Sequence, residues 1–319
     1  MLRVLVVGVP RGGTTWVGKA LGNSDATAYV HEPDGTRDPM AFRHRALDRQ
    51  GQFDFLNVGD LAPEYERLWD GAFSGGRARR SMYARLVVRA LDGLPREERN
   101  AARLGNRLSL TTKFVLRGAR PLLPRRDVDA VVVKSVHAAM SLEWIYGVIE
   151  DLRVLVVARE PRNVLASHVA IGFGPPAPLM LAAARRSMQD RWGLEIKTPE
   201  APMAHSALLC VCLMLGLHDG LRRHPEWQMI SHERACEDPH VALARTAESL
   251  GLRFGDRAKA FVSDSDREGT GYETARKASE LADKWKERLT SEDVDVIENV
   301  LEQVPRELWQ VPQPQLPRS

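Results

Sequence analysis

The segment Gly8 to Trp16, GVPRGGTTW, decides the fold prediction because it joins an apolar run to a helix-forming stretch. Residues 2–8, LRVLVVG, have the length and continuous apolar character of a buried strand. Gly8 and Gly13 have the spacing of the P-loop, whose backbone N–H groups wrap a phosphate at a helix start. Thr14 stands where that motif has lysine, and the cation of the loop is Arg11. The sequence therefore predicts a phosphate-binding loop that lacks the usual lysine of ATP chemistry.

Composition limits the class of protein. The chain has 319 residues, of which 44% are hydrophobic and 27% charged, enough to bury the core of one large domain. Its 45 basic and 42 acidic residues give a net charge of +3, which is too small to indicate a nucleic acid or an anionic membrane as partner. We therefore expect a globular protein that binds a small ligand, with no nucleic-acid partner.

The most apolar later run is SALLCVCLMLGL, residues 206–217. It is shorter than the roughly 20 residues that span a bilayer, so it predicts a buried helix and no membrane insertion. Cys210 and Cys212 lie in this run and Cys236 lies apart, without metal-type spacing, which predicts three reduced, structural thiols. The N-terminal run is short and leads directly into a glycine-rich turn, unlike a signal peptide, so we expect a cytoplasmic protein.

Five apolar runs of strand length alternate with helix-forming stretches, which predicts a parallel sheet between two layers of helices. The predicted strands are residues 2–8, 25–30, 129–136, 153–160 and 227–233. Residues 36–129 contain many arginines and few strand-like runs, which predicts a mainly helical insertion after the second strand. Helices are expected over about 177–224 and at the end of the chain. We predict one three-layer α/β domain, residues 1–319, with a P-loop-like first turn.

Polar side chains follow the predicted strands. They are His31 and Glu32 after the second strand, Lys134 and His137 at the end of the third, and Arg159 followed by Ser167 after the fourth. Parallel strands deliver the loops at their carboxyl ends to one edge of the sheet, where ligands bind in open α/β folds. The sequence thus predicts cations, a carboxylate and imidazoles around the loop of Arg11.

Two motifs resemble those of the sulfotransferases, which use 3′-phosphoadenosine-5′-phosphosulfate (PAPS). PRGGTTW resembles the phosphosulfate-binding loop of that family, with Arg11 where Lys or Arg is expected. REPRNVLAS resembles the second family element, in which an Arg at a strand end and a Ser eight residues later hold the 3′-phosphate; here these are Arg159 and Ser167. That spacing carries the chain from the strand tip into the second turn of a helix, so guanidinium and hydroxyl can face one phosphate. The resemblance implies the sulfotransferase fold, PAPS as donor, adenosine 3′,5′-bisphosphate (PAP) as product, and no metal.

The resemblance also implies which residues hold the donor. They are Arg11, Gly12, Gly13, Thr14, Thr15, Trp16, Arg159, Ser167, His232, Arg276 and Lys277. Arg276 and Lys277 belong to residues 275–301, which resemble the segment that closes over the cofactor in the family. His232 stands where a Tyr that stacks on adenine is typical. Trp16 is expected near the adenine, with an ordinary core position as the alternative.

Sulfuryl transfer is an in-line displacement that needs cations on the oxygens of the donor and a base for the acceptor hydroxyl. A sulfuryl group carries less negative charge than a terminal phosphoryl group, so Arg11 and Lys134 can serve without Mg²⁺. Glu32 is the preferred base, because HEPD resembles the Glu-Pro of carbohydrate-directed and many bacterial sulfotransferases. His137 is the alternative base, since KSVH resembles the Lys-Thr-His of the cytosolic branch. A third interpretation is that Glu32 only orients the acceptor or pairs with Arg11.

Two other classes of function remain open at this level: a P-loop kinase or NTPase, and a noncatalytic PAP-binding protein. The acceptor is expected to be a small molecule, a carbohydrate or a lipid. An anionic or sugar-type acceptor is a hypothesis that rests on four arginines of the insertion, Arg77, Arg79, Arg80 and Arg85.

Overall fold

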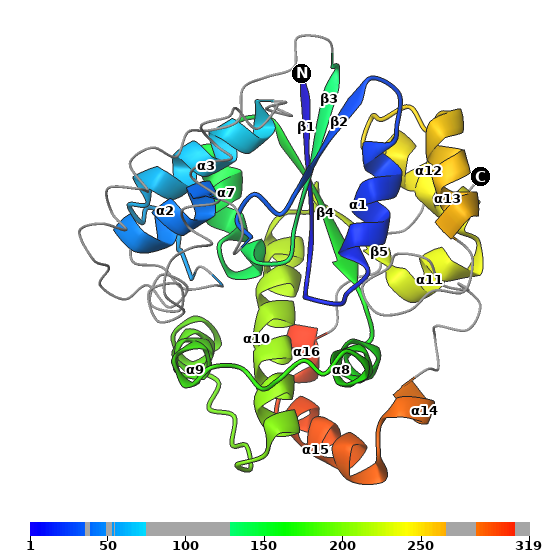
Figure 1. Cartoon of the computed structure of the whole chain (residues 1–319). Coiled ribbons are helices and arrows are strands. Elements are labelled where there is room, and N and C mark those ends of the chain that lie inside the picture. The colour runs from blue at the N-terminus through cyan, green and yellow to red at the C-terminus, as the bar shows by residue number, and fades with distance from the viewer. Residues whose placement is uncertain (36–38, 49–52, 54, 75–127, 266–284, 310–319) are drawn as a thin grey trace.

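The computed structural model of the chain describes residues 1–35, 39–48, 53, 55–74, 128–265 and 285–309 (Figure 1). Its centre is a five-stranded parallel sheet in the order β2-β3-β1-β4-β5. The strands are β1 (Leu2–Gly8), β2 (Thr27–His31), β3 (Ala130–Ser135), β4 (Leu152–Ala158) and β5 (Gln228–Ser231). The predicted α/β architecture with a parallel sheet is confirmed.

Two strands, β4 and β5, end two residues earlier than the sequence predicts. β4 ends at Ala158 because Glu160 caps the following helix, its side chain accepting from the Asn163 N–H. β5 ends at Ser231, whose hydroxyl caps a helix that begins at His232. Polar residues at the carboxyl end of a parallel strand often start the next helix, and an apolar pattern alone does not mark that change.

The central strand β1 is buried on both faces. Val4 and Val6 of β1 face one layer of helices, Leu5 and Val7 face the other, and all four are fully buried. This two-residue alternation on a strand with no polar face is typical of a parallel sheet between two helical layers.

One face is covered by the helices that lie to the right in Figure 1. They are α1 (Thr14–Gly22), α11 (His232–Glu237), α12 (Pro239–Ser249) and α13 (Asp256–Ser265). The remaining helices cover the opposite face or lie beyond the carboxyl edge of the sheet (Figure 1). They are α2 (Pro39–Leu47), α3 (Pro63–Phe73), η1 (Ala138–Met140), α7 (Leu142–Val148), α8 (Pro161–Ala170), α9 (Pro178–Trp192), α10 (Pro202–Arg223), α14 (Trp285–Arg288), α15 (Ser291–Glu302) and α16 (Arg306–Trp309).

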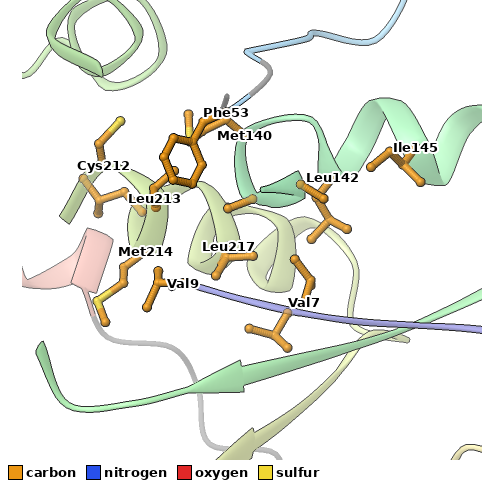
Figure 2. Packing of buried hydrophobic residues seen from close by; sticks show 14 of the residues in the cluster. Val7, Val9, Phe53, Met140, Leu142, Ile145, Cys212, Leu213, Met214 and Leu217 are labelled. Atoms are coloured by element: carbon orange, nitrogen blue, oxygen red, sulfur yellow. The ribbon is translucent and has the colours of Figure 1, made fainter. Parts of the chain in front are cut away.

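Helix α10 is the apolar centre of that second face. Figure 2 shows Leu213 and Leu217 of α10 among Val7, Val9 and Phe53. The helix has 22 residues and an 18-residue window of mean hydropathy 1.4, so by length and composition it is the one helix of the described chain that could cross a membrane. In the structure 67% of that window is buried, and α10 contacts α8, α9 and α15. The predicted buried helix is therefore confirmed and is longer at both ends than the apolar run.

All three cysteines lie in the described residues; each is buried, and none forms a disulfide. Within the predicted insertion, the described residues form α2 and α3, whereas 75–127, with the four arginines named above, lie outside the described residues. The single-domain organisation and the helical character of the whole insertion stay predictions.

Candidate active site

The strand order places a ligand site at the carboxyl end of β1. The chain runs from β1 to β2 on one side and returns to β3, and it then passes over β1 to β4 and β5 on the other side, so the connections change direction beside β1. Such a switch point opens a crevice at the carboxyl edge of a parallel sheet. The loop of residues 9–13 lies there, between β1 and α1.

The loop is a tight turn with two residues in the left-handed region, Arg11 at φ 66° and Gly13 at φ 88°. The Gly12 N–H donates to the Val9 carbonyl over 2.9 Å. A Cβ on residue 13 would lie 2.0 Å from Cδ2 of His232, so both the backbone angle and the contact require glycine. Successive N–H groups in such a conformation form a concave site for an anion.

Helix α1 adds its N-terminus to this site. Helical hydrogen bonding begins where Trp16 N donates to the Gly13 carbonyl over 3.1 Å. The N–H groups of Thr14 and Thr15 precede this bond and therefore point out of the helix start, where the helix dipole favours negative charge. The first turn can thus hold a phosphate or sulfate group, as the sequence predicts.

The two motifs, far apart in sequence, meet at this loop. Arg11 Nε donates to Ser167 Oγ over 2.9 Å. Arg159 Nη1 donates to the carbonyl oxygen of Arg11 over 2.7 Å. The structure therefore brings Arg11, Arg159 and Ser167 together, as expected from strand-end positions in a parallel sheet.

The electrostatics of Arg159 suit an anionic ligand. Burial lowers the pKa of Arg159, and the nearby guanidinium groups of Arg11 and Arg288 lower it further, against the opposing effect of Glu233. The Glu233 carboxylate stands 3.9 Å from Arg159 Nε. An arginine stays charged in a protein, so a site with several guanidinium groups and one carboxylate is favourable for a phosphate. Neither Glu233 nor Arg288 stood out in the sequence, because an acid or a base on a surface helix is common.

Glu32 and Lys134 form a short ion pair next to the loop. Lys134 Nζ donates to Glu32 Oε1 over 2.5 Å, and the Glu32 N–H donates to the Lys134 carbonyl over 2.7 Å. His31 Nε2 is 3.8 Å from the other carboxylate oxygen. The structure thus pairs Glu32 with Lys134, whereas a pairing with Arg11 stays an alternative.

This ion pair sets the protonation of both groups. Burial raises the pKa of Glu32, but the charge and hydrogen bond of Lys134, with a smaller effect of His137, lower it below its usual value. Burial, with a smaller effect of the charge of Arg11, lowers the pKa of Lys134 below its usual value, and Glu32 and Asp34 oppose this effect. Glu32 also has a positive φ of 43°, a conformation that costs a non-glycine residue free energy and is common at functional sites.

His137, the alternative base, lies on a buried turn after β3. Its ring centroid is 5.5 Å from that of Phe53. The His137 N–H donates to Ser135 Oγ over 2.9 Å, and that hydroxyl donates to both Asp34 oxygens at 2.8 and 2.7 Å. Asp34 and Ser135 fix the backbone that carries His137. Sequence reasoning missed this role, although Asp34 belongs to the HEPD stretch.

Trp16 and His232 support the loop from the α1 side. Their ring centroids are 5.9 Å apart at 71°, and Trp16 Nε1 donates to Ser265 Oγ over 2.8 Å. The His232 ring packs against Gly13 and is 5% exposed. Burial, reinforced by the charge of Arg159, lowers the pKa of His232 to about 3 and keeps the ring neutral. Stacking of either ring on an adenine stays a prediction, and this contact identifies His232 first as a support of the loop.

The C-terminal segment lies beside α8. The Arg162 guanidinium carbon is 4.5 Å from the centroid of Trp285, and Arg162 Nη1 is 3.2 Å from Glu298. Part of the predicted closing segment is therefore next to the helix that carries Ser167. Arg276 and Lys277 lie outside the described residues, so their role stays a prediction.

Fold and site together define a parallel α/β protein with a cationic anion-binding loop at the carboxyl edge of its sheet. No family model matches the chain, and no curated protein matches it. Solved structures do match, at low identity. A sulfotransferase domain from the curacin biosynthetic pathway is 16% identical over 95% of this chain and 98% of its own, with a TM-score of 0.44.

Two further solved structures match at similarly low identity. A sulfotransferase from Alicyclobacillus acidocaldarius is 13% identical over 97% of this chain and 99% of its own, with a TM-score of 0.39. Retinol dehydratase, in complex with androsterone and the inactive cofactor PAP, is 14% identical over 99% of this chain and 84% of its own, with a TM-score of 0.38. The functional conclusion below is drawn from the residues of this chain.

Proposed function

We propose that this protein is a sulfotransferase that moves a sulfuryl group from PAPS to a hydroxyl group of a small-molecule, carbohydrate or lipid acceptor. The observation that carries the proposal is the meeting of the two motifs. Arg11 of the loop bonds Ser167, and Arg159 bonds the backbone of the loop. PAPS carries two anionic groups, a 5′-phosphosulfate and a 3′-phosphate. Two adjoining cationic sites on one sheet edge match this pair of charges.

The residues divide between the two anionic groups according to their positions. The N–H groups of residues 12–16, the hydroxyls of Thr14 and Thr15, and the Arg11 side chain hold the 5′-phosphosulfate. Arg159 and Ser167 hold the 3′-phosphate, with Arg276 and Lys277 proposed to add to it. Each contact is a charge-assisted or helix N-terminal hydrogen bond, the kinds that bind phosphate most strongly in proteins.

The reaction is a displacement at sulfur. The acceptor oxygen attacks the sulfur atom, the bond from sulfur to the bridging oxygen of the 5′-phosphate breaks, and PAP leaves with the bonding electron pair. Arg11 and Lys134 stabilise the negative charge that grows on the bridging and sulfuryl oxygens. The proton of the acceptor hydroxyl passes to a base of the protein.

Glu32 is the proposed base. Its lowered pKa keeps the carboxylate ionised at neutral pH, so it can accept a proton, and Lys134 holds it at one end. The same ion pair weakens it as a base, because basicity falls with pKa. His137 remains the alternative, since it lies close enough for its charge to affect Glu32.

A P-loop kinase or NTPase would place carboxylates for Mg²⁺ near the phosphates. Here Lys134 lies near the carboxyl end of β3, and Arg159 directly follows β4. The Asp34 carboxylate that follows β2 is fully buried and occupied by Ser135. The charges at the strand ends therefore favour a donor that is bound by protein cations.

Two measurements test the proposal. We expect PAP to raise the melting temperature of the protein and Mg-ATP to leave it nearly unchanged; the reverse order would indicate a nucleotide-hydrolysing or kinase function. We also expect transfer of ³⁵S from labelled PAPS to at least one alcohol in a mixed panel. Tight PAP binding without transfer to any acceptor would instead indicate a noncatalytic PAP-binding protein.

A further inference from the structure

A cavity of about 410 Å³ lies beside the loop, on the side of the sheet that α10 covers. Among the described residues, its wall is formed by the start of the loop after β1, by Phe53, by the helices α8, α9 and α10, and by the segment 171–177 that joins α8 to α9. Figure 1 shows these three helices grouped beyond the carboxyl edge of the sheet. The volume falls in the range of small-molecule sites, about 300 to 1,000 Å³.

One end of this cavity reaches the proposed reaction centre. Val9 and Pro10, the two residues before Arg11, line it. Phe53 lines it as well and packs against the His137 ring. Figure 2 shows Phe53 and Val9 near Leu213 of α10, another lining residue. A molecule that fills the cavity therefore approaches the loop that would present the sulfuryl group.

The chemistry of the wall limits what can fill it. Among the described residues that line it, no Lys, Arg, Asp or Glu occurs; His168, Ser206 and Cys210 are the polar side chains, and the others are apolar residues or glycine. A charged or many-hydroxyl ligand would lose its hydration there without matching partners, whereas an apolar body gains from burial.

The three polar side chains are also neutral. Burial and the nearby charges of Arg11 and Arg159 lower the pKa of His168 to about 4, although a hydrogen bond to the Pro10 backbone opposes this effect. Burial, with a smaller effect of Glu160, raises the pKa of Cys210 to about 12. The described residues of the wall thus carry no net charge at neutral pH. The nearest cation in the sequence is Arg11, the residue after Pro10.

We propose that this cavity is the acceptor site and that the acceptor is an uncharged alcohol with a mainly apolar body. This inference rests on the proposed function, because the cavity becomes an acceptor site only if the loop holds a sulfuryl donor. The hydroxyl of the acceptor lies at the end formed by Val9 and Pro10, and its apolar body lies against α8, α9 and α10. This differs from the anionic or sugar-type acceptor that the arginines of the insertion leave open as a hypothesis.

Two variants in the first turn of α9 test the proposal. Met180 lines the cavity, and its neighbour Leu179 is 55% exposed and does not line it. A glutamate at either position is equally close to the positive end of the helix dipole, so the effect of the helix on each variant is similar. We would compare Met180→Glu with Leu179→Glu.

The readouts are PAP affinity by calorimetry, and turnover of ³⁵S-labelled PAPS with a long-chain or polycyclic uncharged alcohol, a sugar, and an anionic phenol. The wild type should use the uncharged apolar alcohol best. Met180→Glu should raise KM for that alcohol by about tenfold or more, with PAP affinity unchanged, because it buries a charge against the acceptor. Leu179→Glu should behave as the wild type.

Sulfation of the sugar or the anionic phenol in preference to the apolar alcohol would overturn the acceptor proposal and leave the proposed function intact. An equal change of KM for the apolar alcohol in Met180→Glu and Leu179→Glu would also overturn the acceptor proposal and leave the proposed function intact. Absence of PAP binding and of all transfer in the wild type would overturn the proposed function, and the acceptor proposal with it. The PAP measurement therefore separates the two failures.

Discussion

At the scale of single residues, Arg159 has the most direct test. Its side chain is 10% exposed, bonded to the loop through Arg11, and placed near two other guanidinium groups. Arg159→Ala removes a charge-assisted partner of the proposed 3′-phosphate. We expect PAP affinity, measured by calorimetry, to fall by about 2 to 4 kcal/mol, the range for loss of one partner of a buried charged pair.

Arg153→Ala is the matched control for this substitution. Arg153 is an exposed arginine on the same strand, at the opposite end, where it donates to the Leu250 carbonyl over 2.7 Å. Its removal should leave PAP affinity unchanged. Equal affinities of the wild type and Arg159→Ala would refute the assignment of this donor site.

Glu32→Gln tests the proposed base, because it keeps the shape of the side chain and removes its basicity. Loss of general base catalysis typically lowers turnover by a factor of about 10² to 10⁴. Donor affinity should barely change, since the carboxylate bonds Lys134 and the glutamine amide oxygen can still accept that hydrogen bond. Single-turnover rates with labelled PAPS, together with PAP titrations, measure the two quantities.

The pH dependence of turnover and a pair of variants test Glu32 as the base. Lys134 and His137 hold the pKa of Glu32 below its usual value despite its burial, so with Glu32 as base the rate should fall only at pH below about 4.5. If Glu32→Gln retains turnover while His137→Ala abolishes it at unaltered PAP affinity, the imidazole is the base.

At the scale of elements, the turn from β1 into α1 depends on Gly13. Gly13→Ala places a Cβ 2.0 Å from the His232 ring at a residue with φ 88°. We expect a loss of folding free energy of more than about 1 to 2 kcal/mol, the cost of the left-handed conformation alone, because the contact with His232 adds to it. PAP binding should weaken in parallel, since the N–H groups of the loop move.

Gly193→Ala provides the comparison. Gly193 ends α9 with φ 66°, and nothing lies within 4 Å of its ideal Cβ position. This variant carries the backbone strain without the contact, so chemical denaturation should show the smaller loss, and PAP affinity should not change. Equal losses in the two variants would show that His232 does not support the loop.

The helices and strands were predictable from the sequence, whereas the pairing partner and the register of each strand were not. An apolar run of strand length and a glycine-rich turn are local signals, and β1, its loop and α1 lie where these signals place them. The ion pair of Glu32 and Lys134 depends on the pairing of β2 with β3, in which His31 lies opposite Lys134. One residue of slip would reverse the faces of β2, and no pattern within one strand specifies its partner.

The same reason explains the missed support of His137. The Asp34 carboxylate, just after β2, accepts from Ser135 at the end of the neighbouring strand β3, about 100 residues later in the sequence. The convergence of Arg11, Arg159 and Ser167 was predictable because all strands of a parallel sheet end at one edge, whatever their order. The contact of the His232 ring with Gly13 was not, since it depends on how β5 lies in the sheet.

At the scale of the whole molecule, we expect the activity to be independent of divalent metal. The proposed charge stabilisation comes from Arg11, Lys134 and the helix start, and a sulfuryl group carries less charge than a phosphoryl group. Turnover of PAPS should therefore persist in excess EDTA. Loss of turnover in EDTA that is restored when Mg²⁺ is added back would favour the kinase interpretation.

The stability of the whole fold should also depend on pH through its buried histidines. The pKa of His232 falls from 6.5 to about 3 by burial and by the charge of Arg159. Between these values the unfolded chain binds a proton that the folded protein excludes. The stabilisation is therefore complete above pH 6.5 and is lost as pH falls toward 3, by about 1.4 kcal/mol per pH unit for one such group. His168, with a pKa of about 4, adds to the same trend.

Urea denaturation of ligand-free protein between pH 7 and pH 4 tests this dependence. His232→Asn lowers stability at every pH through lost packing, but it should also flatten the pH profile by up to about 1.4 kcal/mol per pH unit. His240→Asn replaces an exposed histidine and should leave the slope as in the wild type. The slope of the unfolding free energy against pH distinguishes two effects of His232. Lost packing lowers stability equally at every pH, whereas exclusion of a proton by the buried neutral ring changes the slope. Identical slopes in the wild type and His232→Asn would show that the ring takes up its proton in the folded protein, and the contact with Gly13 would then have to open near neutral pH.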